Sequence, residues 1–337
     1  MTSLEITEIF EKFNSLKALV IGDVMIDSYL WGEVERISPE APVPIVNVNK
    51  RENRLGGAAN VALNLQALGA TPFLCSVIGD EPKGETLIQL MQSQGLSNEG
   101  IVKSPNRITT TKFRVIGNNT QMLRVDEEMD TNVQDDESEK LFLAIENLIR
   151  KEKINVIIFE DYDKGVITST LIDKVAGLAS KLLIPVAADP KRRNFKSYKN
   201  ITLFKPNLKE LKEGLKLDFN PKDPSDLKNP VDELQVKNNI DNIMVTLSEA
   251  GVYFSQKEKN KDTVVFRQTI PAHIRNIADV SGAGDTVISV AALCLALGLE
   301  MSLIASLSNL AGGLVCEEVG VVPVDKEKLL KEALTMI

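Results

Sequence analysis

Histidine and cysteine are scarce in this sequence of 337 residues. Its one histidine, His273, cannot supply a metal site built from several histidines or an HExxH helix. The three cysteines, Cys75, Cys294 and Cys316, form no CxxC pair and stand among apolar residues, which indicates buried thiols in a reducing compartment more than a redox centre. The chemistry must therefore use carboxylates, amides and backbone groups.

Long apolar runs and an excess of positive charge are missing as well. The longest uncharged apolar stretch, residues 286–299, is shorter than the roughly 18 residues that a membrane span needs. The first segment contains Glu5, Glu8 and Glu11 and lacks the basic start of a signal peptide. With 39 basic and 47 acidic residues the net charge is −8, which disfavours a nucleic-acid surface. We expect a cytoplasmic protein with a small-molecule partner, and neither a membrane nor a nucleic acid.

The hydrophobic pattern predicts an α/β fold. Short β-branched runs read as buried strands at residues 18–22, 73–78, 156–159, 185–188, 201–204 and 243–246. Helical spacing or helix start signals occur between them at residues 58–68, 84–94, 137–150, 169–182, 206–214, 230–239 and 285–297. Continuous apolar strands separated by helices form parallel sheets that are covered on both faces.

Two regions interrupt this alternation. One is residues 43–48, and the other is a pair of strand-like runs, 109–116 and 121–125, joined by Gly117-Asn118-Asn119-Thr120. An Asn/Gly turn between two such runs predicts a β-hairpin. The length suggests about two domains, but we expect a single domain over residues 1–337 with a discontinuous β-layer, or lid, from about 30–50 and 108–126. Residues 221–230, rich in Pro, Asp and Lys, predict a surface connection.

The sharpest motif is Asp-Val-Ser-Gly-Ala-Gly-Asp-Thr at residues 279–286, directly ahead of an apolar helix. Small residues at Gly282, Ala283 and Gly284 leave backbone N–H groups free to converge on an anion at the positive end of the helix dipole. Asp285 in the first helical turn could then accept the proton of an attacking hydroxyl. An ordinary capping aspartate after a glycine turn is the alternative interpretation.

A second motif has paired glycines, Gly56 and Gly57, that open a helix carrying Asn60. Glycine lets the backbone approach a ligand, and the Asn60 amide can bind a pair of sugar hydroxyls. Tight packing of helix on sheet would explain the pattern equally well. Asp23 and Asp27 follow the first strand, at the edge where open α/β sheets bind ligands. Asp27 could bind hydroxyls, or both aspartates could cap a turn.

Together, residues 56–62 and 279–286 resemble the two signatures of the PfkB (ribokinase-like) carbohydrate kinase family. Asn207-Leu208-Lys209-Glu210 is similar to the family's NxxE element, and residues 245–251 are similar to its nucleotide-binding strand and turn. The resemblance covers nearly the whole chain. It implies a three-layer α/β/α domain with a mostly parallel sheet and a small β-sheet lid.

The resemblance also implies the roles of these residues. Asp285 would deprotonate the anomeric hydroxyl that attacks the γ-phosphoryl of ATP, while the amides of residues 282–284 stabilise charge. Glu210 and Asn207 would hold Mg²⁺ through water. The nucleotide side would be formed by Thr246, Ser248, Glu249, Gly251 and Asn309. No Walker A sequence occurs, which disfavours a P-loop kinase. A monovalent cation near residues 279–285 stays an open possibility.

Within the family, residues 36–44, 161–165, 189–191 and the hairpin resemble the heptose 7-phosphate kinases of lipopolysaccharide-core precursor synthesis. The implied reaction converts D-glycero-β-D-manno-heptose 7-phosphate into the 1,7-bisphosphate. Bifunctional members carry an adenylyltransferase domain with an HxGH motif, which is absent from this sequence, so we expect the kinase-only form and a separate adenylyltransferase. The alternatives are a kinase for another sugar or sugar phosphate (fructose, ribose or tagatose phosphate type) and a non-catalytic sugar-binding relative.

A phosphorylated sugar requires cations in its site. The candidates are Lys112, Arg114 and Arg124 on the hairpin and Lys191 after a strand, although each could equally belong to a solvated face. Gln121 on the hairpin is a further substrate-binding candidate. Because lids in this family often pair between protomers, the resemblance also implies a homodimer through the lid.

Overall fold

The computed structural model describes residues 2–217, 223–258, 264–273 and 275–337. Two sheets organise these residues: a main sheet of nine strands, in the order β13-β12-β11-β10-β9-β8-β1-β4-β5, and a small sheet of four, in the order β3-β2-β6-β7. The neighbouring strands β11, β10, β9, β8, β1, β4 and β5 of the main sheet pair in parallel. At the β11 edge, β12 and β13 are added in antiparallel orientation. The predicted α/β class is therefore confirmed.

The main-sheet strands are β1 (Lys17–Gly22), β4 (Thr71–Gly79), β5 (Gly100–Ser104), β8 (Val156–Glu160), β9 (Val186–Asp189), β10 (Leu203–Phe204), β11 (Asn242–Thr246), β12 (Val252–Lys257) and β13 (Val264–Ile270). The helices are α1 (Ser3–Phe13), α2 (Ala58–Ala67), α3 (Pro82–Ser93), α4 (Asp135–Lys151), α5 (Ser169–Leu182), α6 (Leu208–Leu215), α7 (Lys228–Lys237), α8 (Ala283–Ala296), α9 (Met301–Val315) and α10 (Lys326–Met336). Within the described part of the chain, no helix combines the length and apolar character that crossing a membrane requires.

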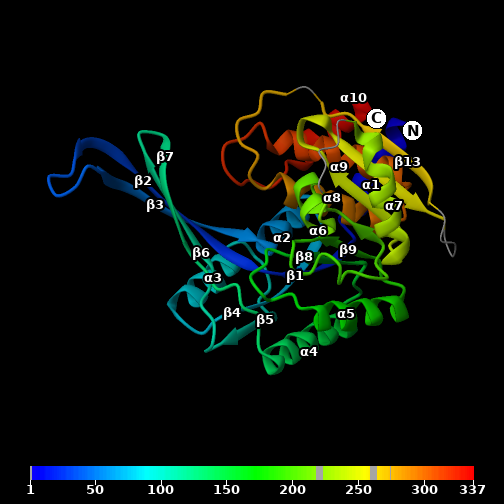
Figure 1. The fold of residues 1–337 in the computed structure, drawn as a ribbon, viewed down its shortest axis with the longest axis horizontal. Coiled ribbons are helices and arrows are strands. Elements are labelled where there is room, and N and C mark those ends of the chain that lie inside the picture. Colours follow the sequence, from blue (N-terminus) through cyan, green and yellow to red (C-terminus); the bar gives the residue numbers. More distant parts are fainter. Residues whose placement is uncertain (1, 218–222, 259–263, 274) are drawn as a thin grey trace.

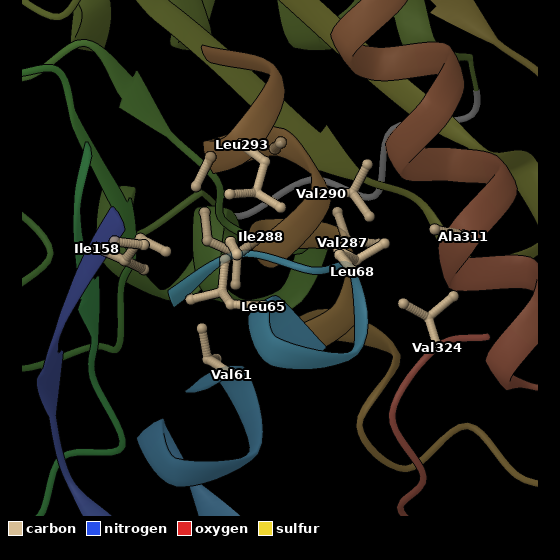
Figure 2. Close-up of a cluster of buried hydrophobic side chains, with 14 of the residues drawn as sticks. Val61, Leu65, Leu68, Ile158, Val287, Ile288, Val290, Leu293, Ala311 and Val324 are labelled. Atoms are coloured by element: carbon tan, nitrogen blue, oxygen red, sulfur yellow. The ribbon is translucent and has the colours of Figure 1, made fainter. Parts of the chain in front are cut away.

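Apolar side chains cover both faces of the main sheet, which produces the three layers. One core cluster packs α1, α2, α3, α8, α9 and α10 on one face, and the other packs α4 to α7 on the opposite face. Figure 2 shows the first cluster where α2 meets α8: Val61 and Leu65 lie beside Ile288, and Ile158 of β8 closes the cluster from the sheet. This packing fixes the N-terminus of α8 against α2.

The small sheet is made of β2 (Val24–Ile37), β3 (Pro44–Gly57), β6 (Thr111–Gly117) and β7 (Thr120–Glu127). Figure 1 shows these strands leaving the body of the protein together, with β2 and β3 extending furthest. The predicted hairpin is present: β6 and β7 are antiparallel, and Asn118 and Asn119 both adopt positive φ in the two-residue turn. Together, β2 and β3 start before and end after the range of about 30–50 expected for the β-layer, whereas β6 and β7 lie within a few residues of the expected 108–126.

Several expected boundaries differ from the observed ones. Gly56 and Gly57 are the last residues of β3, and α2 begins at Ala58. The connection expected over 221–230 is shorter, because a 3₁₀ turn forms at Pro224–Leu227 and α7 begins at Lys228; residues 221–222 lie outside the described residues. The sequence prediction missed α1, α9, α10, β2, β5, β12 and β13.

Candidate active site

The N-terminus of α8 carries the residues of the predicted anion site. Gly282 caps the helix with φ +80°, a conformation that favours glycine. Its carbonyl accepts from Thr286 N–H at 3.0 Å, and Ala283 N–H donates to Val280 at 3.4 Å. Contrary to expectation, the Ala283 amide is therefore engaged within the turn. Among the described residues no partner is found for the N–H groups of Gly282, Gly284 and Asp285, so these three amides can receive an anion.

Asp285 is buried directly beside these amides, with both carboxylate oxygens bound. Oδ2 accepts from Asn60 Nδ2 at 2.7 Å and Oδ1 accepts from Tyr162 Oη at 2.8 Å. Burial raises the pKa of Asp285 to about 6, and the hydrogen bonds from Asn60 and Tyr162 oppose that rise. A carboxylate that is fixed in orientation and whose pKa lies close to neutral pH is suited to accept a proton.

Asn60 reaches Asp285 because α2 and α8 are locked together by polar as well as apolar contacts. Asn64, one turn further along α2, accepts from Thr286 Oγ1 at 2.9 Å and from Val324 N–H at 3.0 Å. Its Nδ2 donates to the Asn60 carbonyl at 3.0 Å. The structure thus brings together the two predicted motifs through the hydrogen bond between Asn60 and Asp285, which are 225 residues apart in the sequence.

Two carboxyl groups at strand ends lie on the same side of the sheet as α8. Glu160 ends β8 and Asp189 ends β9, and they are register partners. A Cβ added at Gly284 would stand 3.7 Å from Asp189 Oδ2 and 3.8 Å from Lys205 Nζ, so the helix N-terminus lies over this group. Lys205 pairs with Asp189 at 2.7 Å.

Three oxygens of this pair have no hydrogen-bond partner among the described residues: both of Glu160 and Oδ1 of Asp189. Burial, with the charges of Asp189 and Asp285, raises the pKa of Glu160 well above its usual value. The sequence analysis missed Glu160, although a polar residue directly after an apolar strand marks the ligand-binding edge of a parallel sheet. Unpaired carboxylate oxygens are the ligands that a hard divalent cation takes.

The NxxE element forms a helix cap in this structure. Asn207 Oδ1 accepts from Glu210 N–H at 2.8 Å, and Glu210 Oε2 accepts from Asn207 N–H at 2.8 Å. Glu210 also pairs with Lys191, whose Nζ lies 5.3 Å from the centre of the Tyr162 ring. Among the described residues, no group of three or more His, Cys, Asp or Glu side chains is arranged to hold a metal ion.

An open groove of about 790 Å³ runs past the ends of β11 and α6. The predicted residues Asn207, Thr246, Ser248 and Glu249 line it, together with Leu208, Lys209, Lys212, Glu213, Lys216, Leu217 and Leu247. Gly251 turns the chain just beyond it with φ +91°, where a Cβ would stand 2.0 Å from the Ile270 carbonyl oxygen. Asn309 is not part of this described lining, and its Nδ2 donates to the Pro271 carbonyl at 2.9 Å.

The paired glycines bring the small sheet close to Asp23 and Asp27. A Cβ at Gly56 would stand 2.4 Å from Asp27 Oδ2, and one at Gly57 would stand 2.4 Å from the Asp23 carbonyl oxygen. Asp23 is buried and its carboxylate accepts three backbone N–H hydrogen bonds at 2.9–3.1 Å, from Tyr162, Lys164 and Val166. Asp23 therefore organises the loop that carries Tyr162, whereas buried Asp27 pairs with Arg114.

The other predicted cations are already engaged by acidic side chains. Lys112 contacts Asp126 at 3.1 Å and Glu128 at 3.2 Å, and Arg124 binds both oxygens of Asp126 at 3.0 and 3.1 Å. Lys191 faces Glu210, as described above. Gln121 lies exposed on β7. Of the four cations, only Arg114 reaches a residue expected to contact the sugar.

Curated relatives match most of this chain. The chain is 39% identical over 318 residues to "Bifunctional protein HldE" of Desulfatibacillum aliphaticivorans, covering 94% of this chain and 63% of the relative. It is 36% identical over 334 residues to the protein of the same name from Geotalea uraniireducens, covering 98% of this chain and 66% of the relative. The chain therefore spans less than two thirds of the length of these relatives.

Solved structures share the fold at low sequence identity. Phosphofructokinase-2 from Escherichia coli in complex with potassium superposes with a TM-score of 0.75 at 18% identity, over 95% of this chain and 99% of that one. Ribokinase from Arabidopsis thaliana, complexed with ribose and ATP, superposes with a TM-score of 0.68 at 17% identity, over 94% of this chain and 99% of that one. The ribokinase-like fold prediction is confirmed. A model of the pfkB family carbohydrate kinases matches residues 15–328, and the chain belongs to this family.

Proposed function

We propose that this chain transfers the γ-phosphoryl group of ATP to the anomeric hydroxyl of D-glycero-β-D-manno-heptose 7-phosphate. The observation that carries the proposal is Asp285, held by Asn60 and Tyr162 beside the free amides at the start of α8. The likeness to proteins named HldE and the subgroup segments of the sequence support the choice of a heptose phosphate.

Asp285 acts as the general base in this proposal. Its carboxylate accepts the proton of the sugar hydroxyl as that oxygen attacks the γ-phosphorus and the bond to the bridging oxygen of ADP breaks. The N–H groups of Gly284 and Asp285, with the positive end of the α8 dipole, stabilise the charge on the transferring group. Asn60 and Tyr162 keep the carboxylate oriented toward the hydroxyl.

The residues present fit Mg²⁺. The unpaired oxygens of Glu160 and Asp189 are hard donors below the anion site, and two carboxylates with nucleotide phosphates are the usual protein environment of this ion. Mg²⁺ neutralises charge on the phosphates. We assign its binding to Glu160 and Asp189, and Glu210 and Asn207 act through water and through the position of Lys191.

The groove beside β11 receives the nucleotide in this proposal. Thr246, Ser248 and Glu249 line it at the strand end, and Gly251 allows the sharp turn that follows. We propose that the small sheet excludes water from the sugar, because water would otherwise accept the phosphoryl group. A homodimer through this sheet and action in the cytoplasm complete the proposal.

A coupled ADP-release assay tests the substrate. The purified chain with MgATP should turn over heptose 7-phosphate with a kcat/KM at least about tenfold above that for fructose, ribose or fructose 6-phosphate, a preference that the specific contacts of one pocket can supply. Faster turnover of any of these other sugars would contradict the assignment. Repeating the assay with added K⁺ or Na⁺ determines whether a monovalent cation is required.

A further inference from the structure

An aromatic ring in the small sheet lies between two arginines. Tyr29 is on β2, the strand between β3 and β6. The Arg54 guanidinium carbon, from β3, is 5.0 Å from the Tyr29 ring centre, and that of Arg114, from β6, is 5.3 Å away. The buried ring of Tyr29 therefore holds both guanidinium groups by cation–π contacts, one from each neighbouring strand.

This group faces the active site. Arg54 is the register partner of Asp27 and Arg114 is that of Tyr29, so the three side chains share one face of the sheet with Asp27. A Cβ added at Gly320 would stand 3.2 Å from Arg54 Nη1. The N–H of Gly320 donates to Asp279 at 3.1 Å, in the loop that leads into α8. Arg54 thus stands where the small sheet meets the loop that leads to Asp285.

Each guanidinium keeps N–H groups available. Glu52 accepts from Nε of Arg54 at 2.7 Å, and this contact, with a second from Lys50, lowers the pKa of Glu52 to about 2. Within the described residues, both Nη groups of Arg54 are without a hydrogen bond, and Arg114 bonds only through Nη1, to Asp27. Lys112 and Arg124, in contrast, each make two contacts with acidic side chains, Lys112 with Asp126 and Glu128 and Arg124 with both oxygens of Asp126.

We infer that Arg54 and Arg114 form the subsite for the phosphate that the sugar substrate already carries, at the end away from its reacting hydroxyl. The inference rests on the proposed function and adds Arg54 and Tyr29 to it. Two planar N–H forks match the oxygens of a phosphate dianion. Glu52 and Asp27 orient the forks, and Asp27 also lies within reach of the sugar ring through its contact with Gly56.

Variants at Arg54 test the inference against heptose 7-phosphate and unphosphorylated heptose. We expect R54Q to lower kcat/KM for the phosphate by about 10–100-fold, mainly through KM, the effect of losing charge-assisted hydrogen bonds. The value for free heptose should stay within about twofold. R54K keeps the positive charge but lacks the planar N–H fork, so its kcat/KM for heptose 7-phosphate should lie between those of the wild type and R54Q. The matched control is R51Q, which removes the same charge from an exposed position on the opposite face of β3.

Competition by inorganic phosphate provides a second readout that does not need turnover of free heptose. Phosphate should inhibit the wild type and R51Q competitively with the sugar phosphate, and R54Q should be inhibited several-fold more weakly. Equal losses of R54Q on both sugars, or unchanged inhibition by phosphate, would overturn the inference. If the wild type prefers fructose 6-phosphate and R54Q loses that activity selectively, the heptose assignment fails and the phosphate subsite stands.

Discussion

The phenolic oxygen of Tyr162 donates a hydrogen bond of 2.8 Å to Oδ1 of Asp285, a residue 123 positions later in the sequence. Tyr162 follows the end of β8, and backbone N–H groups of its loop donate hydrogen bonds to the Asp23 carboxylate. The hydrogen bond stabilises the charged form of Asp285, whose pKa burial has raised. The loop after β8 therefore tunes the pKa of a carboxyl group on α8 that we propose as the general base.

Removing this hydrogen bond should move the acid limb of the pH profile. With the Asp285 pKa at about 6, kcat/KM of the wild type should fall by half near pH 6, because the base must be ionised. In Y162F the pKa rises further, so the half-point should move to higher pH and the loss should be larger at pH 6 than at pH 8. Y198F, which removes a bond to Asp161, is the control. Superimposable profiles for wild type and Y162F would refute the tuning.

Replacing Asp285 by asparagine removes the base. We expect D285N to lose about 10²–10⁴-fold in kcat, the range that general-base catalysis contributes, with the ATP affinity retained in a binding assay. Unchanged ATP-dependent turnover would instead favour a non-catalytic role for Asp285. The measurement uses the same ADP-release assay at pH 8, where the wild-type carboxyl group is ionised.

D285N should also raise the free energy of unfolding at neutral pH. Because the folded-state pKa of Asp285 is raised to about 6 from 3.8, the stability linked to its protonated form is present below about pH 4 and lost as pH rises to 6. D285N should therefore gain about 1–3 kcal/mol over the wild type at pH 7 and little at pH 4. Urea unfolding at the two pH values measures this. An equal difference at both would show that the buried charge is not the cause.

Glu160 should control the magnesium requirement. E160Q removes one of the two carboxylates with unpaired oxygens, so the Mg²⁺ concentration for half-maximal activity should rise about tenfold, a typical penalty for losing a contributor to a metal site. The control is E146Q, at a half-buried glutamate on α4 that pairs with Arg150. An unchanged Mg²⁺ dependence of E160Q would remove Glu160 from the proposed site.

Two glycine-to-alanine changes should have opposite effects. In G56A the new Cβ would stand 2.4 Å from Asp27 Oδ2, so Asp27 must move and KM for the sugar should rise, with a stability loss of about 1–3 kcal/mol. Gly177, inside α5, has no atom within 4 Å of a built Cβ, and G177A should stabilise by about 0.5–1 kcal/mol. Thermal unfolding and sugar kinetics measure both. A G56A variant with wild-type KM would separate Gly56 from the substrate site.

The main sheet and the starts of α2 and α8 were predictable because local signals specify them. Apolar strand runs, helix start signals and the glycines ahead of Asp285 each act over a few residues, and α8 and α2 begin within two residues of the predicted positions. The small sheet was harder. β2 begins with a mostly apolar run and ends in charged residues, and the charged residues of β3 at 50–54 lie on both faces, so no regular alternation of apolar and polar residues revealed these strands.

The missed site residues depend on strand order instead of local pattern. Glu160 and Tyr162 reach Asp285 only because β8 lies beside β1 and β9 in the sheet. Arg54 was not predicted as a site residue, because it lies beyond the range of about 30–50 that was expected for the β-layer. Conversely, Lys112, Arg124 and Lys191 were named for their charge, and their acidic partners became visible only with the fold. The sequence identifies residues that could bind a ligand, but only the fold shows which of them are already paired with a neighbouring side chain.

The small sheet enters and leaves the main domain at few points: β2 follows β1 after one residue, and β3 ends where α2 begins. The far portions of β2 and β3 thus extend away from α8 and from the groove beside β11, to which the proposed function assigns the nucleotide. Mutations along this arm can change which sugar is accepted while the phosphoryl-transfer apparatus stays intact. Such a separation gives a lineage of kinases a route to new substrates without rebuilding its catalytic centre.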